Sequence, residues 1–274
     1  MREAPVLARR AALGGALALL AAPRPAGAVE WQGAPAQGAL IVGRAAPGTR
    51  LALDGRAVRV GADGAFAFGF GRDHGAEATL AVTDPDGRRE VRRILVARRQ
   101  WPVQRITGLP PAQVTPDAAA LARIRAERER LAAARATDSA RTDFARGFGW
   151  PARGRISGVY GSQRILNGEP RQPHLGFDIA APVGTPVLAA ASGRVTLAGE
   201  FFFFGRLLVV DHGHGVNTLY AHLSEAVVPE GAEVEQGERI GAIGATGRVT
   251  GPHLHFGLSW YQTFLDPQPV LPPA

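Results

Sequence analysis

Six of the seven histidines in this 274-residue chain lie between residues 174 and 255, and four of them have spacings that can build a reactive site. His253 and His255 flank a single residue. Side chains at positions i and i+2 of a strand project from the same face, about 7 Å apart along the backbone. Both imidazoles can therefore reach one metal ion, or one can bind the ion while the other contacts a water molecule.

A second spacing, His174-x-x-x-Asp178, adds a carboxylate to the candidate group. An ideal strand would separate these residues by about 13 Å, too far to share an ion whose ligand bonds measure about 2.0–2.2 Å. We therefore expect the chain to bend between them, with Gly176 supplying the backbone freedom. The chain has no cysteine, so a metal must be held by histidine and carboxylate. The same absence excludes disulfide scaffolds, iron–sulfur clusters and thiol nucleophiles.

A second His-x-His pair, His212 and His214, competes with the first. Gly213 and Gly215 fall within the same short stretch, which predicts a tight turn rather than a strand. The argument for a shared strand face then fails. We expect this pair to lie at the tip of a hairpin and not to bind metal.

Short strands must position these side chains. From Trp150 onward, apolar runs separated by glycine predict strands and no long helix, with strands expected over 187–189, 195–197, 207–210, 217–221 and 239–243. His222 follows one of these runs. The run Phe201 to Phe204 is expected in a hairpin near the site, and core packing is the default interpretation of its rings.

The N-terminal half predicts a different module. Between about residues 38 and 98, apolar alternations surround turn signals such as Asp54-Gly55, and Phe66, Phe68 and Phe70 repeat at period two. These features predict a small Ig-like β-sandwich over 29–100. The protein is thus expected to be all-β, with a linker over 101–149 and a C-terminal β domain over 150–270.

One helix is expected in the linker, over 116–137. Thr115 is a suitable N-cap, Pro116 suits the first helical position, and Asp117 complements the helix dipole in the first turn. Leu121, Ile124 and Leu131 form only a thin apolar stripe. This pattern favours a solvated spacer helix, and the alternative is a lid that lies against the C-terminal module.

Residues 1–28 have the three parts of a secretory signal peptide: early arginines, the apolar run 11–22, and the small-residue stretch Ala26-Gly27-Ala28. The run is too short to span a bilayer as a helix. We expect a periplasmic or secreted protein, with no stable membrane insertion after signal cleavage. The formal net charge of +7 comes from 31 arginines and no lysine, but residues 150–274 hold more acids than arginines. This distribution argues against nucleic acid as a partner.

Three stretches together resemble peptidase family M23, the lysostaphin-type or LytM-type zinc peptidases of bacterial cell walls. They are His174-Leu175-Gly176-Phe177-Asp178 with its continuation to Val187, Tyr220-Ala221-His222-Leu223-Ser224, and Gly251-Pro252-His253-Leu254-His255-Phe256. The resemblance covers about residues 150–268. It implies a compact antiparallel β fold with zinc in a groove, and zinc ligands at His174, Asp178 and His255. It also implies that His253 and His222 form the catalytic pair, with His253 as the general base and His222 stabilising the oxyanion.

The resemblance further implies a zinc metalloendopeptidase that hydrolyses peptide cross-links of peptidoglycan. We favour the D-alanyl–diaminopimelate bond, and a glycine bridge is the other candidate. Two other functions stay open: a non-catalytic activator of a cell-wall amidase, and a wall-binding scaffold in which the N-terminal module dominates. The sequence does not specify any protein partner.

Overall fold

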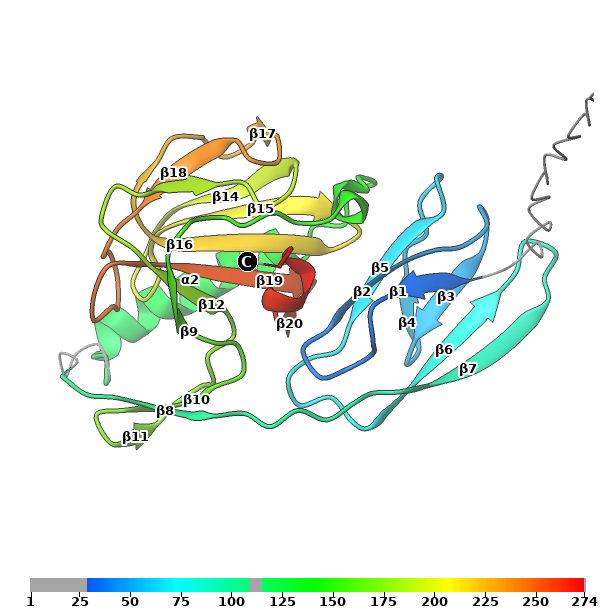
Figure 1. Cartoon of the computed structure of the whole chain (residues 1–274), viewed down its shortest axis with the longest axis horizontal. Helices are drawn as coiled ribbons and strands as arrows, with labels where there is room; N and C mark the ends of the chain where they lie inside the picture. The colour runs from blue at the N-terminus through cyan, green and yellow to red at the C-terminus, as the bar shows by residue number, and fades with distance from the viewer. Residues whose placement is uncertain (1–28, 109–114, 274) are drawn as a thin grey trace, which may run out of the picture.

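The computed structural model describes residues 29–108 and 115–273, so the expected signal peptide lies outside the described residues. Two β modules lie side by side, and one long segment runs along both of them (Figure 1). Strands dominate and helix α2 (Ala118–Arg135) flanks the C-terminal module, which confirms the all-β prediction. No helix among the described residues has the length and apolarity to cross a bilayer.

The N-terminal module is a sandwich of two antiparallel sheets, in the orders β1-β2-β5 and β4-β3-β6-β7. Phe66 and Phe68 are fully buried, with ring centroids 5.9 Å apart. Asp54 and Gly55 both have positive φ, at 47° and 81°, as a type I′ hairpin turn between β3 and β4 requires. The strands are β1 (Glu30–Gln32), β2 (Leu40–Arg44), β3 (Arg50–Leu53), β4 (Arg56–Val58), β5 (Ala65–Gly69), β6 (Glu77–Thr83) and β7 (Arg89–Leu95).

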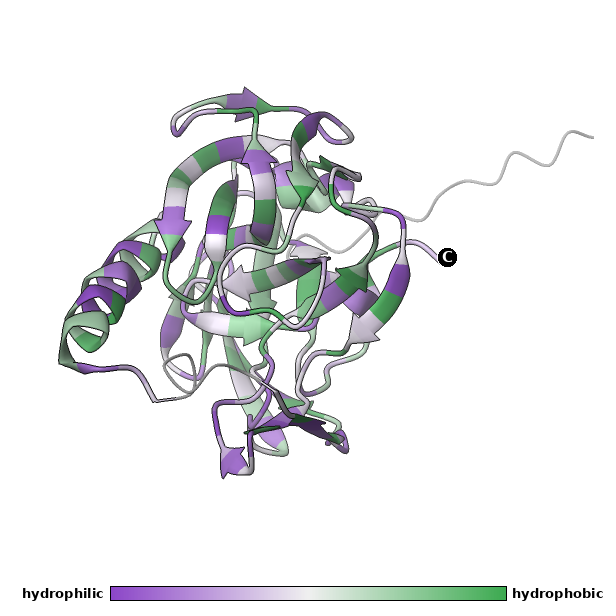
Figure 2. Cartoon of the chain, turned by 90° about the vertical axis from the view of Figure 1, so that its left-hand side faces the viewer, coloured by the Kyte–Doolittle hydropathy of each residue, from purple (hydrophilic) through white to green (hydrophobic). Residues whose placement is uncertain are grey.

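The C-terminal module is a ten-stranded sheet in which every pairing is antiparallel. Its main path runs β17-β14-β15-β16-β19-β12-β9, with β13, β18 and β20 paired beside it. Hydrophilic and hydrophobic residues alternate along several of its strands (Figure 2). The strands are β9 (Arg155–Gly158), β12 (Phe177–Ala180), β13 (Pro186–Leu188), β14 (Gly193–Phe201), β15 (Gly205–Gly213), β16 (Val216–Ala226), β17 (Glu233–Val234), β18 (Arg239–Ile243), β19 (His253–Trp260) and β20 (Thr263–Leu265). Two 3-10 turns, η1 (Asp143–Arg146) and η2 (Gln268–Val270), complete the module.

The linker contributes a strand to the C-terminal module. Strand β8 (Val103–Ile106) pairs in parallel with β10 (Gln163–Leu166), which pairs with β11 (Glu169–Pro170). The modules also touch directly, because Arg99 forms a 2.7 Å ion pair with the buried Asp266. The linker is therefore attached to the C-terminal module just before residue 109.

Helix α2 (Ala118–Arg135) differs from its prediction at its start and in its packing. Asp117, not Thr115, is the N-cap, and its Oδ1 accepts a 2.8 Å hydrogen bond from Ala120 N. Leu131 is buried in a cluster with residues of β14, β15 and β16, and Ile124 is buried too. The expectation of a solvated spacer is wrong, because even a thin apolar stripe can pack against a second face of the sheet.

Candidate active site

Three neighbouring strands bring the predicted site residues together. In the sheet, β19 lies between β12 and β16, and Asp178 of β12 stands directly opposite His255 of β19. On the other side, Ala221 of β16 pairs with His255, and His222 follows Ala221. Side chains of opposed residues on one face of a sheet lie close enough to interact. Sheet register thus assembles residues that are about 80 positions apart in the sequence.

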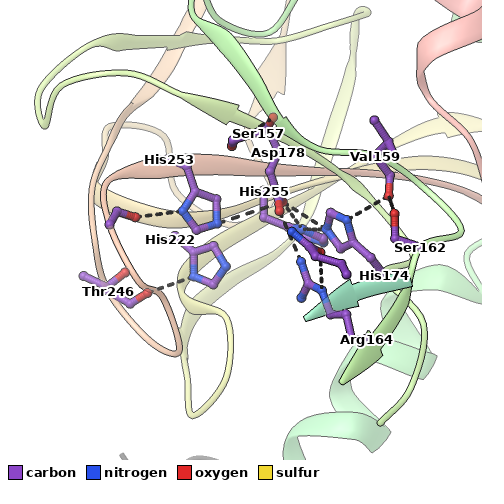
Figure 3. A network of polar contacts seen from close by, with 12 residues as sticks. Ser157, Val159, Ser162, Arg164, His174, Asp178, His222, Thr246, His253 and His255 are labelled. Carbon is purple, nitrogen blue, oxygen red and sulfur yellow. Dashed lines mark hydrogen bonds and ion pairs between the residues drawn. The ribbon is translucent and has the colours of Figure 1, made fainter. Parts of the chain in front are cut away.

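His174, Asp178 and His255 form the one group of potential metal ligands found among the described residues. His174 Nε2 lies 3.0 Å from Asp178 Oδ1 and 3.0 Å from His255 Nδ1, and the latter two atoms are 2.9 Å apart. Figure 3 shows the three side chains converging. A tetrahedral ion with bonds of about 2.0–2.2 Å would separate its ligand atoms by about 3.3–3.6 Å, so the triangle is only slightly contracted.

The hydrogen-bond partners of His174 test whether a cation fits this triangle. Its Nδ1 lies 3.2 Å from the carbonyl oxygen of Val159, a contact that places a proton on Nδ1. In the neutral ring Nε2 then carries a lone pair, which faces the carboxylate oxygen of Asp178. Two acceptors at this distance repel each other, and a cation between them removes the repulsion. Two imidazoles and one carboxylate are a zinc donor set, so the residues present fit that metal.

Protonation states in the group also suit metal binding. Burial lowers the pKa of His255 to about 4, although contact with Asp178 opposes the shift. The ring is therefore neutral at pH 7 and offers a lone pair. Burial disfavours the ionised form of Asp178, but hydrogen bonds and charge from His174 and His255 hold its pKa well below the ordinary value.

Two glycines make room for the group. A Cβ at Gly176 would overlap the imidazole of His255, and a Cβ at Gly158 would overlap the carboxylate of Asp178. Gly176 is not among the residues with positive φ. Gly176 is therefore needed to leave space for His255 and not, as expected from the sequence, to give the backbone unusual freedom.

His253 and His222 lie beside the metal group, with ring centroids 4.7 Å apart. Each Nδ1 is 2.8 Å from a backbone carbonyl oxygen, that of Gly251 for His253 and that of Thr246 for His222. When either ring is neutral, its Nε2 is therefore the proton acceptor. Burial, reinforced by the neighbouring histidines, lowers the pKa of His222 to about 3. His222 also has a φ of 64°, an uncommon conformation for a residue with a side chain.

Arg164 joins the site although the sequence argument did not select it. Its Nη2 donates a 3.2 Å hydrogen bond to Asp178 Oδ2, the carboxylate oxygen that faces away from the two histidines. Arg164 Nε also donates a 3.4 Å hydrogen bond to Oε1 of Gln104, a residue of the linker strand β8. Nothing in the local sequence signals this arrangement, because it depends on the pairing of β8 with β10.

The aromatic run also contributes to the site. Phe204 lies in the turn between β14 and β15, and its ring centroid is 5.8 Å from that of His255. Its carbonyl accepts a 2.8 Å hydrogen bond from His222 N. The expected hairpin near the site is present. Phe201 is buried, as the core interpretation predicts, and Phe203 and Phe204 form part of the site wall.

The second His-x-His pair lies apart from the metal group, as predicted. The expected tight turn is shorter than predicted, because β15 continues through His212 to Gly213 and only His214 and Gly215 form the turn. His212 is near the end of β15, and His214 follows in the turn before β16 with a φ of 51°. His212 Nδ1 donates to the carbonyl oxygen of Ser192 at 2.7 Å, and its Nε2 accepts from Thr218 Oγ1 at 2.8 Å. Both ring nitrogens of His212 are thus engaged by the protein itself.

Residues 172–267 match the model of peptidase family M23. The C-terminal module belongs to this family. DipM, a cell division protein of Caulobacter vibrioides, is 41% identical over 128 residues, which are 46% of this chain and 20% of DipM. ShyA, a peptidoglycan DD-endopeptidase of Vibrio cholerae, is 43% identical over 105 residues, which are 38% of this chain and 24% of ShyA. The chain therefore matches less than a quarter of the length of these relatives.

The structural similarity to known proteins is not confined to the M23 module. A crystal structure of a Pseudomonas aeruginosa protein described as an M23 peptidase superposes with a TM-score of 0.64 at 28% identity. The match covers 86% of this chain and 94% of the other. It therefore extends well beyond the M23 module.

Proposed function

We propose that this protein is an exported zinc endopeptidase that hydrolyses peptide cross-links of bacterial peptidoglycan. The observation that carries the proposal is the triangle of His174, Asp178 and His255, with the two further histidines beside it. His174, Asp178 and His255 would hold zinc, which supplies Lewis-acid chemistry by polarising a carbonyl and acidifying water. The peptidoglycan endopeptidase named among the relatives supports the substrate.

His253 is suited to the role of general base. Its Nδ1 is held by the carbonyl of Gly251, and the free acceptor Nε2 lies 3.9 Å from Asp178 Oδ1 at the edge of the metal group. A proton accepted at Nε2 converts the ring to an imidazolium, which can then pass the proton to the leaving nitrogen. The ring is partly exposed, so substrate can reach it.

The role of His222 is constrained by its tautomer. With Nδ1–H bound to Thr246, the neutral ring can only accept a hydrogen bond at Nε2. Stabilising an oxyanion there requires a second proton on the ring. A glutamine amide can donate without protonation. His222→Gln should therefore retain more turnover than His222→Ala if donation to the oxyanion is the role of this residue.

The deciding experiment incubates the zinc-loaded mature protein with purified peptide dimers that are cross-linked through D-alanyl–diaminopimelate bonds. We expect monomers whose stem peptides are otherwise intact, and loss of this product on chelation with recovery on adding zinc. Cross-linked muropeptides serve as a second substrate. Release of whole stem peptides from their glycan would show an amidase, and absence of any product would favour the activator of an amidase.

A further inference from the structure

A cavity of about 540 Å³ lies beside the metal group, between helix α2 and the C-terminal sheet. His174, His222 and His255 form part of its wall. Phe204 and residues of α2 complete the enclosure next to them. A peptide bound at the metal group therefore has room to extend into this space.

The charge of the cavity wall is strongly positive. One glutamate, Glu127, faces five arginines on the wall, which are Arg128, Arg135, Arg164, Arg171 and Arg248. Glu127 is already engaged, because Oε1 accepts from Arg123 at 2.7 Å and Oε2 accepts from Phe202 N at 2.8 Å. The surrounding module has an excess of acids over arginines. The positive charge is thus concentrated at this cavity and is not a general property of the module.

Arg135 adds a buried positive charge to the cavity wall. The residue is 9% exposed, and its guanidinium lies 4.5 Å from the centroid of Phe264. No carboxylate of the described chain forms an ion pair with it. Burial lowers its pKa to about 10, so the group stays charged at neutral pH. A buried charge of this kind is costly unless an anion accompanies it.

Arg248 is the arginine best placed to meet a substrate. It lines the large cavity and also a smaller cavity of about 120 Å³ bordered by Asp178, His222 and His253. The backbone N of Arg248 donates a 2.9 Å hydrogen bond to the carbonyl oxygen of Phe203. The guanidinium of Arg248 lies 4.1 Å from the centroid of the Phe203 ring. The side chain is therefore held between the metal group and the larger cavity.

We propose that Arg248, assisted by Arg171, binds a free carboxylate of the substrate next to the scissile bond, and so selects carboxylate-bearing cross-links over neutral ones. The inference rests on the proposed peptidase function. In a D-alanyl–diaminopimelate cross-link, the carbon that bears the scissile nitrogen also bears a carboxylate. An oligoglycine bridge offers no charge there. Guanidinium groups bind carboxylates through strong, charge-assisted hydrogen bonds.

Arg164 has a different role in this scheme. It lines the same cavity, but its Nη2 already donates to Asp178 Oδ2. It is a positioning residue for the metal ligand and adds to the field that attracts the anion. Arg171 also lines the cavity, and its Nη1 lies 3.8 Å from Oε2 of the exposed Glu169.

Two soluble peptide dimers provide the test, identical except that one carries the free carboxylate beside the scissile nitrogen and the other carries its amide. Binding is measured by calorimetry with the zinc-loaded mature protein carrying His253→Ala, so that neither dimer is consumed. We expect the free acid to bind at least about 10-fold more tightly. Adding Arg248→Gln or Arg171→Gln to the His253→Ala protein should reduce the ratio of the affinity for the free acid to the affinity for the amide. Arg125→Gln removes the same charge from an exposed helix position outside the cavity and should preserve it.

The outcomes separate this inference from the function on which it rests. Equal binding of the two dimers, or a ratio that survives both arginine substitutions, overturns the carboxylate site. Equal hydrolysis of both dimers by the wild-type protein also overturns it and leaves the peptidase function standing. Preferential binding of the acid without hydrolysis of either dimer supports the carboxylate site and overturns the peptidase. Circular dichroism checks that each variant is folded, and Arg171→Gln provides the test if Arg248→Gln is not.

Discussion

Two His-x-His pairs of the same module have opposite surroundings. His255 Nδ1 meets a carboxylate oxygen and another imidazole nitrogen within 3.0 Å. His212 instead has one nitrogen bound to a backbone carbonyl and the other to a hydroxyl. Nδ1 of His255 thus faces two groups that can bind the same cation, whereas both ring nitrogens of His212 are hydrogen-bonded within the protein. Identical spacing therefore predicts a metal site only when the flanking strands supply further ligands.

The largest expected difference between the pairs is in metal binding. His255→Ala should abolish zinc binding and turnover, because it removes a direct ligand, and even the loss of a supporting residue around a metal costs about 10- to 100-fold in affinity. His212→Ala is the matched control and should keep about one zinc per chain. Competition with a chromophoric chelator measures both affinities. Full zinc occupancy in His255→Ala would show that the ligand set is wrong.

His253 allows a comparison within the first pair, because it lies two residues from the proposed zinc ligand His255 and is not itself one of the proposed ligands. His253→Ala should lower kcat by about 10²- to 10⁴-fold, as expected when a general base is lost. Zinc content should not change. Single-turnover assays on the cross-linked dimer, with metal analysis of the same sample, measure the two effects together. Loss of zinc from this variant would instead make His253 a ligand and require the roles of the pair to be exchanged.

The second pair should affect the pH dependence of folding stability and should not affect zinc binding or catalysis. Burial lowers the pKa of His212 to about 4, against about 6.5 for an unfolded chain. As the pH falls from about 6.5 to about 4, the His212 imidazole becomes protonated in the unfolded chain but stays neutral in the folded protein. The free energy of unfolding should therefore decrease between about pH 6.5 and pH 4, by about 3 kcal/mol from this residue.

The control for this window is His212→Gln, which has no group that titrates there. Urea denaturation at several pH values should give a shallower loss of stability for the variant than for the wild type, with other titrating groups common to both. Parallel pH dependences would show that His212 titrates in the folded protein much as it does in the unfolded chain. Zinc affinity at pH 7 should be unchanged in this variant.

The smallest expected effect concerns the support of the first pair. Arg164→Gln should weaken zinc binding by about 10- to 100-fold, because Asp178 loses the donor that fixes its second oxygen. Arg164→Lys should recover part of the loss, and Arg125→Gln should have no effect. Chelator competition distinguishes this role from a purely structural one. Unchanged affinity in Arg164→Gln would show that Asp178 needs no such support.

Most of the candidate site could be selected from sequence, whereas its supporting residues could not. The His-x-His and His-x-x-x-Asp spacings select His174, Asp178, His253 and His255 as candidates, and the resemblance to family M23 then assigns His174, Asp178 and His255 as the ligands. Gln104 reaches Arg164 through the pairing of β8 with β10, which joins segments about 60 residues apart. Arg248 and Phe204 enter through turns whose positions depend on the completed sheet.

The fold divides in the same way. Period-two alternation and turn signals such as Asp54-Gly55 were sufficient for an all-β protein with an N-terminal sandwich. The helix was also predictable, because its propensities and capping residues are local. Its packing was not, since Leu131 is buried by strands that follow it by more than 60 residues.

The sequence by itself determined which side chains are available for chemistry: histidine and carboxylate without cysteine, with His253 and His255 on one face through strand alternation. Tertiary structure decided which of two equal spacings acquires a carboxylate neighbour, because that depends on the register of β12 against β19. It also decided that Gly176 supplies space for an imidazole rather than freedom for the backbone. Local rules act over a few residues, whereas the electrostatic surroundings of a site are set by segments that meet only after folding.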